Sequence, residues 1–305
     1  MSRYDPYTPG PYAVTEREFN LDDAARNRTF SCSLWVPSRA IAEPVPVILY
    51  SHSSGTNKRA ATLVFTHLAS HGYGVASLNH SETFAPELVR RERESADARA
   101  ARVNGWIANR VPDIRFLLDA LLTGTIAGWN PDPARIGLIG HSFGGWTVLA
   151  VPDLDRRIGA VVAFAPAGGK PTPPGMLDVH LPFTRTHRMP TLFVVAEDDT
   201  SLPLSTMHEL FQRTPEPKQL VVLSRTDHLH FVDDVEHAHE AVRAMLAQGP
   251  LAHLGIRMRP IDDLAGGEET QRILRGLTLA HFDAALRANV DAEVFLKDVP
   301  GRIDI

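Results

Sequence analysis

Cysteine is almost absent from this 305-residue sequence, which contains only Cys32. No disulfide can therefore form within the chain, and the disulfide-stapled scaffolds typical of small secreted domains are excluded. No segment approaches the roughly 18 consecutive apolar residues of a membrane-spanning helix. The first residues, Met1 to Pro6, also lack the apolar segment of a secretory signal. These absences predict a cytoplasmic protein with no membrane partner.

Lysine is also scarce, because only four of the 31 basic residues are lysines (58, 170, 218 and 297). The arginines are scattered along the chain, and the formal net charge is −5. Such a charge distribution gives no reason to expect DNA, RNA or an anionic membrane as a partner. We therefore expect the partner to be a small molecule. The sequence carries no indication of the oligomeric state.

The composition is that of an ordinary globular protein, with 44% hydrophobic and 22% charged residues. A chain of this length buries enough surface to fold without a metal or a disulfide. Neither an internal repeat nor a linker-like segment divides it. We expect an N-terminal arm at residues 1–28 and a single domain at residues 29–305, which ends in a helical extension.

Short apolar segments alternate with amphipathic ones along most of the chain. This alternation predicts an α/β fold with a doubly wound, mostly parallel sheet flanked by helices. Strands are predicted at 29–36, 45–50, 73–78, 136–139, 158–164, 191–196 and 219–223. Helices are predicted at 62–70, 85–122 with a break near Pro112, 143–150, 204–213, 235–247 and 269–288. Residues 168–190 are rich in turn-forming residues and predict an irregular loop.

The segment Gly140-His141-Ser142-Phe143-Gly144 matches the pattern G-x-S-x-G of a nucleophile elbow. The pattern needs small residues around the serine because the serine sits at a tight strand-to-helix turn. The predicted strand at 136–139 and helix at 143–150 supply that context. The alternative is an ordinary glycine-rich turn in which Ser142 only caps the helix. The context favours Ser142 as a nucleophile.

A serine nucleophile needs a base, and the base needs a carboxylate to orient it. In a fold with this elbow, the acid and then the histidine follow the serine along the chain. Acidic residues follow the predicted strand at 191–196, and we favour Asp199, with Asp198 as the alternative. Histidines follow the predicted strand at 219–223, and we favour His228, with His230 as the alternative.

The same histidines could instead contribute to a zinc site, because His-x-His pairs can chelate the metal. His237 and His239 would add a second such pair, although they are more readily explained as residues on a helix face. The sequence contains no H-E-x-x-H motif to support a metal. We therefore expect neither a metal nor an organic cofactor.

A serine hydrolase also needs two backbone N–H groups that stabilise the oxyanion. One belongs to the residue after the nucleophile, Phe143. The other comes from the loop after the strand at 45–50, where Ser54 is the expected donor.

These motifs resemble those of the α/β-hydrolase superfamily. More closely, the chain is similar to the dienelactone-hydrolase-like esterases, a branch shared with platelet-activating-factor acetylhydrolases and cutinase-type polyester hydrolases. The similar segments are Val47-Ile48-Leu49-Tyr50-Ser51-His52, Asp113-Ile114-Arg115-Phe116-Leu117-Leu118-Asp119, residues 135–145 and residues 190–200. The acidic run before Thr200 resembles the acid loop of cutinase-type enzymes, where the last acidic residue serves the triad, and this resemblance implies Asp199.

Three departures from these relatives matter. Dienelactone hydrolases proper use a cysteine nucleophile, whereas this elbow carries Ser142. The oxyanion loop reads His52-Ser53-Ser54-Gly55 where the family usually has His-Gly. Cutinase-type enzymes are secreted and disulfide-stapled, so we do not expect polyester hydrolysis here.

Together these features predict a serine hydrolase of carboxylic esters with an acyl-enzyme on Ser142. Hydrolysis of an amide, a thioester or a lactone by the same residues is the first alternative. A catalytically inactive binding protein on the same fold is the second. Only the loop at 168–190 and the arginine-rich segment at 87–110 can cover the site, so we expect a preference for short acyl chains.

Overall fold

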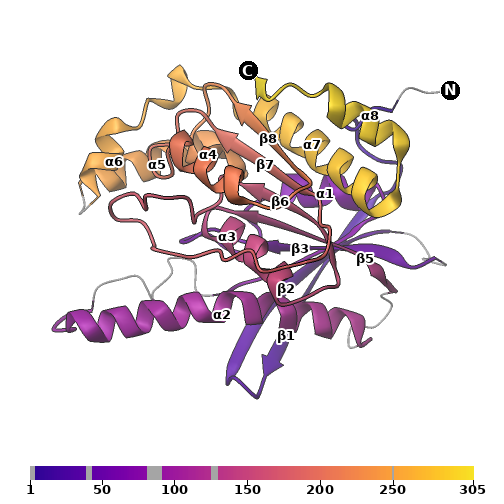
Figure 1. The fold of residues 1–305 in the computed structure, drawn as a ribbon, viewed down its shortest axis with the longest axis horizontal. Coiled ribbons are helices and arrows are strands. Elements are labelled where there is room, and N and C mark those ends of the chain that lie inside the picture. The colour runs from indigo at the N-terminus through magenta and orange to yellow at the C-terminus, as the bar shows by residue number, and fades with distance from the viewer. Residues whose placement is uncertain (1–3, 39–42, 81–90, 125–129, 249–250) are drawn as a thin grey trace.

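The computed structural model describes residues 4–38, 43–80, 91–124, 130–248 and 251–305. Within these residues, nine strands form one sheet in the order β1-β2-β4-β3-β5-β6-β7-β8-β9 (Figure 1). β1 and β4 both run antiparallel to β2, and the other neighbours are parallel. The strands are β1 (Val14–Asp23), β2 (Arg28–Pro37), β3 (Val45–Ser51), β4 (Gly74–Leu78), β5 (Pro131–His141), β6 (Ile158–Phe164), β7 (Thr191–Ala196), β8 (Lys218–Leu223) and β9 (Arg302–Ile303).

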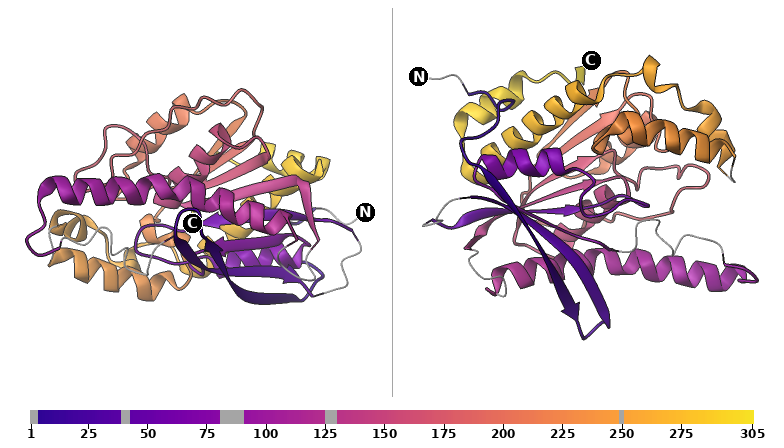
Figure 2. Two further views of the ribbon diagram at one scale, coloured as in Figure 1. Left: turned by 90° about the horizontal axis from the view of Figure 1, so that it is seen from below. Right: turned by 180° about the vertical axis from the view of Figure 1, so that it is seen from behind.

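Helices cover both faces of this sheet, as Figures 1 and 2 show. α1 and α7 pack on one face, and α2, α3 and α4 pack on the other, so that each face has its own apolar core. The helices are α1 (Thr62–Ser70), α2 (Ala96–Leu122), α3 (Phe143–Ala150), α4 (Leu204–Arg213), α5 (Val235–Ala247), α6 (Ala252–Arg257), α7 (Gly267–Arg287) and α8 (Val290–Asp298). Among the described residues, each helix is too short or too polar to be a candidate membrane span.

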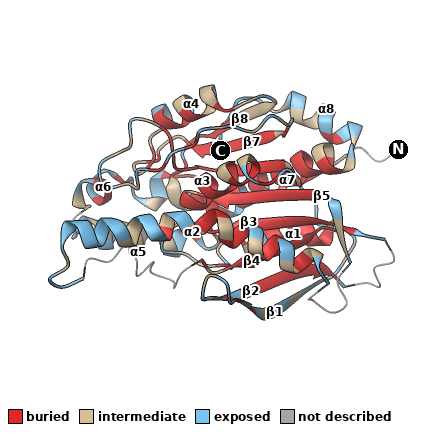
Figure 3. Cartoon of the chain, turned by 60° about the horizontal axis from the view of Figure 1, so that its bottom comes forward, coloured by how far each residue is buried: buried red, intermediate tan, exposed pale blue. Residues whose placement is uncertain are grey.

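The central strands are buried along their whole length, which explains their continuous apolar sequences. Every residue of β3, β4 and β7 is buried (Figure 3). A parallel strand with helices on both sides has no solvent face, so its apolar residues need not alternate with polar ones. This arrangement confirms the predicted doubly wound, mostly parallel sheet flanked by helices.

Several predicted elements match the structure to the residue, including α1, α3, β6 and β7. The predicted break near Pro112 is wrong, because α2 continues through this residue to Leu122. Proline removes one helical hydrogen bond, but the flanking residues Val111 and Ile114 are buried in the core, and this packing holds the helix together. α2 begins at Ala96, where the Ser95 side chain accepts a hydrogen bond from the Ala98 N–H. Residues 85–90 of the predicted helix lie outside the described residues.

The two ends of the chain both add strands that the sequence did not reveal. Residues 14–23, which we expected within an N-terminal arm, form β1 and pair with β2 along ten residues. The hairpin of β1 and β2 extends beyond the neighbouring strands in Figure 2. At the other end, β9 pairs with the end of β8, while α7 packs against β5 and β6.

A buried carboxylate ties this hairpin to α2. Asp113 of α2 accepts hydrogen bonds from Arg26 (2.7 Å) and Arg28 (2.9 and 3.1 Å) near the hairpin turn. It also contacts Nδ1 of His80, which follows β4, at 3.0 Å. The Asp113 side chain is fully buried, so its charge depends on these partners.

Replacing Asp113 with alanine should lower the free energy of unfolding by about 3 kcal/mol, because two arginines and a histidine would lose their buried partner. Urea denaturation of the purified variant measures this change. Asp119→Ala is the matched control, since Asp119 lies on the same helix in an exposed ion pair with Arg157. It should cost less than about 1 kcal/mol. Equal losses in the two variants would contradict this account of Asp113.

Candidate active site

Ser142 lies at a sharp turn between β5 and α3, as the elbow motif predicts. Its backbone has φ +56° and ψ −118°, a conformation that residues with a side chain rarely adopt. Hydrogen bonds hold this turn in place: the Ser142 N–H donates to Phe164 O (2.9 Å), and Ser142 O accepts from Ala167 N–H (2.9 Å) and Trp146 N–H (3.1 Å). The neighbouring strand and loop therefore stabilise the strained geometry.

The glycines of the motif are needed because backbone approaches backbone at the turn. A Cβ at Gly140 would overlap the carbonyl oxygen of Gly144. A Cβ at Gly144 would overlap the carbonyl oxygens of Ser51, the last residue of β3, and of His52, the next residue. Only glycine permits these contacts. The contacts bring the loop after β3 directly against the start of α3.

Of the acidic residues after β7, the structure places Asp199 at the site. Its Oδ1 accepts hydrogen bonds from the backbone N–H groups of Ser201 and Leu202, both at 2.8 Å. Its Oδ2 lies 2.6 Å from Nδ1 of His228. The alternative, Asp198, instead pairs with Arg259 at the surface. The Asp199 side chain is thus fixed by its own loop and aimed at one histidine.

His228 joins Asp199 to Ser142. It begins a short 3₁₀ turn, His228–Phe231, that follows β8. Its Nε2 lies 2.8 Å from Oγ of Ser142. Since an ionised carboxylate can only accept hydrogen bonds, Nδ1 carries the proton that Asp199 accepts, and Nε2 of the neutral ring accepts the hydroxyl proton of Ser142.

The electrostatic surroundings of His228 suit a base. Burial alone would lower its pKa, but the Asp199 carboxylate, assisted by Asp227, raises the pKa above the usual 6.5. The ring can therefore take a proton and remain stabilised as imidazolium. The three side chains can together remove a proton from a hydroxyl and return it to a leaving group.

The other candidate histidines do not reach Ser142. His230 is buried, where its Nδ1 accepts from the Asp227 N–H (3.0 Å) and its Nε2 lies 3.1 Å from Ala265 O. His239 on α5 is also buried, with Nε2 2.7 Å from the Asp227 carboxylate. His237 on the same helix is exposed. These histidines therefore do not converge with His228, and no metal-binding group of three or more residues is found among the described residues.

The two expected oxyanion donors lie on either side of the backbone contact at Gly144. Phe143 is the first residue of α3, and the first N–H groups of a helix have no acceptor within it. Ser54 lies in the turn after β3. The carbonyl of Ser53 accepts from Nδ1 of His52 (2.7 Å) and from the Thr56 hydroxyl (3.3 Å). In a planar trans peptide the N–H points opposite to the carbonyl, so the Ser54 N–H points away from His52.

The sequence did not assign a role to His141, although it stands beside the nucleophile in the motif. Its ring lies 4.8 Å from the ring of His228 and 5.4 Å from that of Phe231. Burial and the neighbouring His228 lower its pKa well below 6.5, so the ring stays neutral. His141 therefore supplies an uncharged ring that contacts the His228 ring at a tilt of 42°.

A cleft of about 510 Å³, with apolar and polar residues in its lining, lies between α2 and the loop at 168–190. One side is a stripe of α2 and the other is the loop: Ala96, Ala100, Val103 and Ile107 face Met176 and Leu177. Ala96 and Ala100 of this stripe are exposed. Trp106, which precedes Ile107 on α2, has its ring 4.6 Å from that of Phe143.

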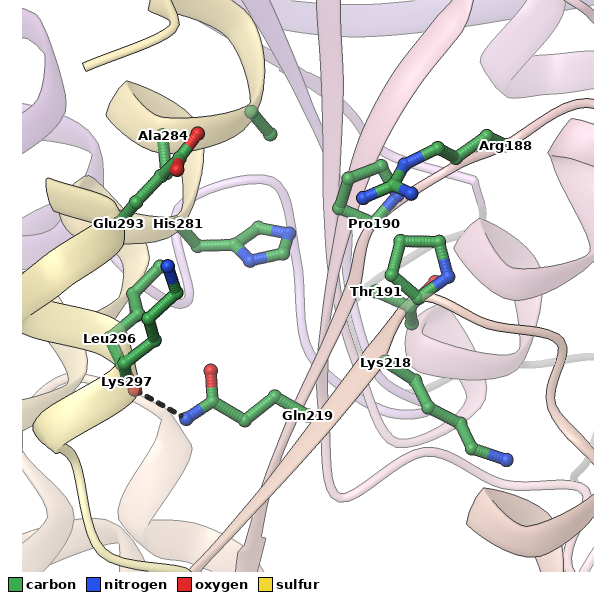
Figure 4. A pocket seen from close by; sticks show the side chains of 12 residues that line it. Arg188, Pro190, Thr191, Lys218, Gln219, His281, Ala284, Glu293, Leu296 and Lys297 are labelled. Carbon is green, nitrogen blue, oxygen red and sulfur yellow. Dashed lines mark hydrogen bonds between the residues drawn. The ribbon is translucent and has the colours of Figure 1, made fainter. Parts of the chain in front are cut away.

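A second pocket, of about 530 Å³, lies at the opposite end of the sheet (Figure 4). It is bounded by the first residues of β7 and β8 and by α7 and α8, with His281, Gln219 and Leu296 among its lining residues. Ser142 and its partners lie at the carboxyl ends of the strands, so this pocket is separate from the chemistry.

Comparisons with known proteins identify the family and the fold of the chain. The sequence pattern of the dienelactone hydrolase family matches residues 30–248. A solved structure of a ferulic acid esterase from Streptomyces cinnamoneus superposes with a TM-score of 0.65 at 20% identity, covering 92% of this chain and 93% of that one. At this identity the likeness shows the fold alone, which is that of an α/β-hydrolase.

Three curated relatives share shorter stretches of sequence. A probable 1-alkyl-2-acetylglycerophosphocholine esterase of Arthroderma benhamiae is 29% identical over 125 residues, 39% of this chain and 31% of that protein. A platelet-activating factor acetylhydrolase of Cavia porcellus is 23% identical over 235 residues, 65% and 51% of the two chains. A chlorophyllase type 0 of Chenopodium album is 26% identical over 131 residues, 41% and 35%. The chain thus spans from about a third to a half of the length of these relatives.

The pKa of His228 is directly measurable by NMR titration of its ring protons. We expect a value above 6.5 in the native protein and a lower value in Asp199→Asn, because the substitution removes the negative charge that favours the imidazolium. Loss of the His228 signals in a His228→Gln sample assigns the resonance. An unchanged or higher pKa in Asp199→Asn would show that Asp199 does not set the charge of this ring.

Proposed function

Because the chain belongs to the dienelactone hydrolase family, we propose that it is a serine hydrolase that cleaves carboxylic esters through an acyl-enzyme on Ser142. One observation carries the proposal. Nε2 of His228 lies 2.8 Å from Ser142 Oγ while Nδ1 lies 2.6 Å from Asp199, and the serine is held at a strained elbow. A binding protein has no need of a polarised, strained serine.

In the proposed reaction, Ser142 Oγ attacks the ester carbonyl as its proton passes to Nε2 of His228. The carbonyl oxygen becomes an oxyanion that accepts hydrogen bonds from the N–H groups of Phe143 and Ser54. Collapse of this intermediate breaks the bond to the alcohol, which leaves with the proton from His228. Water then attacks the acyl-enzyme, again giving its proton to His228, and releases the acid and free Ser142.

The names of the relatives support an ester as the substrate. An esterase and an acetylhydrolase are among them. We place the acyl group in the cleft between α2 and the loop at 168–190, which suits a neutral ester. Two carboxylates that line this cleft are paired within the chain, Glu94 with Arg102 and Asp178 with Lys170. These two groups therefore need no positive charge from the substrate.

Substitution of Ser142 by alanine should abolish ester hydrolysis, because the nucleophile is lost while only a hydroxyl is removed. Loss of the nucleophile typically costs several orders of magnitude in turnover. Hydrolysis of p-nitrophenyl acetate measures the effect, and a fluorophosphonate probe should label the native protein but not the variant. Activity within tenfold of the native level would contradict the proposed nucleophile.

His230→Ala is the matched control for the base. His228→Ala should lose as much activity as Ser142→Ala, whereas His230→Ala should lose far less, because His230 has no contact with Ser142 or Asp199. The reverse order would show that His230 acts as the base. Parallel assays with p-nitrophenyl amides and thioesters separate ester hydrolysis from the other acyl transfers.

We further propose that short acyl groups, of about two to six carbons, are preferred. Between β6 and β7 the chain forms only an irregular loop, with no inserted helix to make a closed tunnel. The cleft residues Ala96 and Ala100 are exposed, so the end of a long acyl chain that reaches them would stay in water. A buried methylene contributes about 0.8 kcal/mol, and an exposed one contributes much less.

The measurement is kcat/KM for p-nitrophenyl esters of increasing acyl length below their solubility limits. The value should reach its maximum at about two to six carbons, for the burial reason just given. A steady rise through twelve or more carbons, or a jump in rate at the solubility limit, would indicate a lipase-like tunnel instead.

A further inference from the structure

Arg110 is a fully buried arginine that lies directly behind the candidate oxyanion hole. It belongs to α2, and none of its surface is exposed to solvent. Its guanidinium carbon is 4.4 Å from the centre of the Phe143 ring and 4.9 Å from that of Trp106. Burying an arginine is costly unless its hydrogen bonds and charge are used. The contacts of Arg110 therefore call for an explanation.

The guanidinium also binds the backbone of the loop that carries Ser54. Its NH1 group donates to the carbonyl of His52 at 2.6 Å and lies 3.5 Å from the Ser51 hydroxyl. Arg110 thus contacts both sides of the site. One contact is the ring of Phe143, whose N–H is the first expected oxyanion donor. The other contact is the loop that carries Ser54, the second expected donor.

Because a peptide unit is planar, the hydrogen bond from Arg110 to the His52 carbonyl also orients the Ser53 N–H. The carbonyl of His52 and the N–H of Ser53 belong to one planar unit and point in opposite directions. Holding the carbonyl against Arg110 therefore turns the Ser53 N–H away from α2. The next peptide unit is fixed by the His52 ring, whose Nδ1 binds the Ser53 carbonyl. Arg110 and His52 together set the orientation of the Ser54 N–H.

The His52 ring can do this only in one tautomer, and its surroundings fix that tautomer. Nε2 of His52 accepts the backbone N–H of His80 at 3.1 Å, so the proton must reside on Nδ1. The pKa of His52 is held well below 6.5 by burial and by the nearby positive charge of Arg110. The ring therefore remains neutral while it donates to Ser53.

We propose that Arg110 is a positioning residue for the oxyanion hole. Arg110 aligns the N–H groups of Phe143 and Ser54 by stacking on the Phe143 ring and by binding the loop that carries Ser54. The inference rests on the proposed function, because it assumes that these two groups stabilise an oxyanion. Arginine suits the role because its planar guanidinium stacks on aromatic rings and donates from its edge at the same time, which lysine cannot do.

The test compares Arg110→Met and Arg110→Lys with the native enzyme in the hydrolysis of p-nitrophenyl acetate. Misaligned donors weaken binding of the transition state more than binding of the ester, so kcat should fall while KM stays within about threefold. Removal of one oxyanion donor costs about 10²–10³ in kcat. We expect a loss of about 10- to 100-fold for Arg110→Met and a smaller loss for Arg110→Lys, which keeps the charge and a donor.

A trifluoromethyl ketone inhibitor supplies a readout that a purely structural role would not change. Ser142 Oγ adds to its carbonyl carbon, the serine proton passes to His228, and the former carbonyl oxygen becomes an oxyanion in the hole. The inhibition constant should rise in proportion to the loss in kcat/KM. The acidic limb of the pH profile should not move, because Arg110 does not contact His228.

Arg115→Met is the matched control, since Arg115 lies on the same helix with a side chain that is 44% exposed. It should leave kcat and the inhibition constant unchanged. Far-ultraviolet circular dichroism checks that each variant is folded, and active-site titration gives the concentration of reactive enzyme by which each rate is divided. If Arg110→Met does not fold, Arg110→Lys serves as the folded variant.

Folded Arg110 variants with native kcat and native inhibitor affinity would overturn the inference, as would a loss confined to KM. The proposed function is tested separately. If the native protein shows no activity that depends on Ser142, the proposed function fails, whereas native activity that is insensitive to Arg110 rejects only the positioning role.

Discussion

The contact between Gly144 and the carbonyl oxygens of Ser51 and His52 is the constraint on which the site depends. It brings the start of α3 against the end of β3, two segments that are far apart in the sequence. The same contact requires a tight turn at Ser142, whose positive φ is the consequence. Because β3 and β5 are parallel neighbours, their carboxyl ends meet at one edge of the sheet. Ser142 and the loop that carries Ser54 are therefore positioned by a single backbone approach.

The proposed acid and base, Asp199 and His228, reach this edge by the same topology. β6, β7 and β8 continue the parallel order beyond β5, so the loops after β7 and β8 open on the same side as the elbow. Asp199 and His228 lie in those two loops. α2 also contacts the site. Arg110 and Asp113 are one turn apart on this helix, and they bind the segments after β3 and β4, respectively. The long helix thus links the oxyanion loop to the hairpin of β1 and β2.

Much of this arrangement could be predicted from the sequence, for identifiable reasons. The strands at 158–164 and 191–196 are short, continuous and apolar. The elbow motif itself predicts a strand before Ser142 and a helix after it. β1 and β9 could not be predicted in this way, because an exposed edge strand and a two-residue strand carry little hydrophobic pattern. The predicted break at Pro112 was wrong, because the tertiary packing of α2 outweighs the tendency of proline to interrupt a helix.

Within the site, the sequence favoured Asp199 and left Asp198 as the alternative, because both lie in the same turn, and a resemblance supported Asp199. The contacts of Arg110, His52 and His80 had no sequence signal at all. They join residues about 30 to 60 positions apart whose types are common in solvated helices and loops. Only the folded chain shows that these polar groups are buried together behind the elbow.

The histidines around the elbow show how one residue type takes different roles through its neighbours. His52, His80, His141 and His228 lie at or after the carboxyl ends of β3, β4, β5 and β8, respectively. His80 touches the Asp113 carboxylate much as His228 touches Asp199, yet burial and the arginines at 26, 28 and 110 lower its pKa well below 6.5. Arg26 and Arg28 also pair with the Asp113 carboxylate, which would otherwise stabilise an imidazolium. His52 and His141 lack a carboxylate contact, and their pKa values are lowered too.

Asp199, in contrast, is held by two backbone N–H groups, which carry no net charge and leave its negative charge free to act on His228. The pKa of His228 is accordingly raised. Of these four rings, His228 is therefore the one suited to exchange a proton near neutral pH, while the others remain neutral hydrogen-bonding or packing groups. His80 and His228 thus differ in whether the partner carboxylate is paired with arginine or with backbone N–H groups.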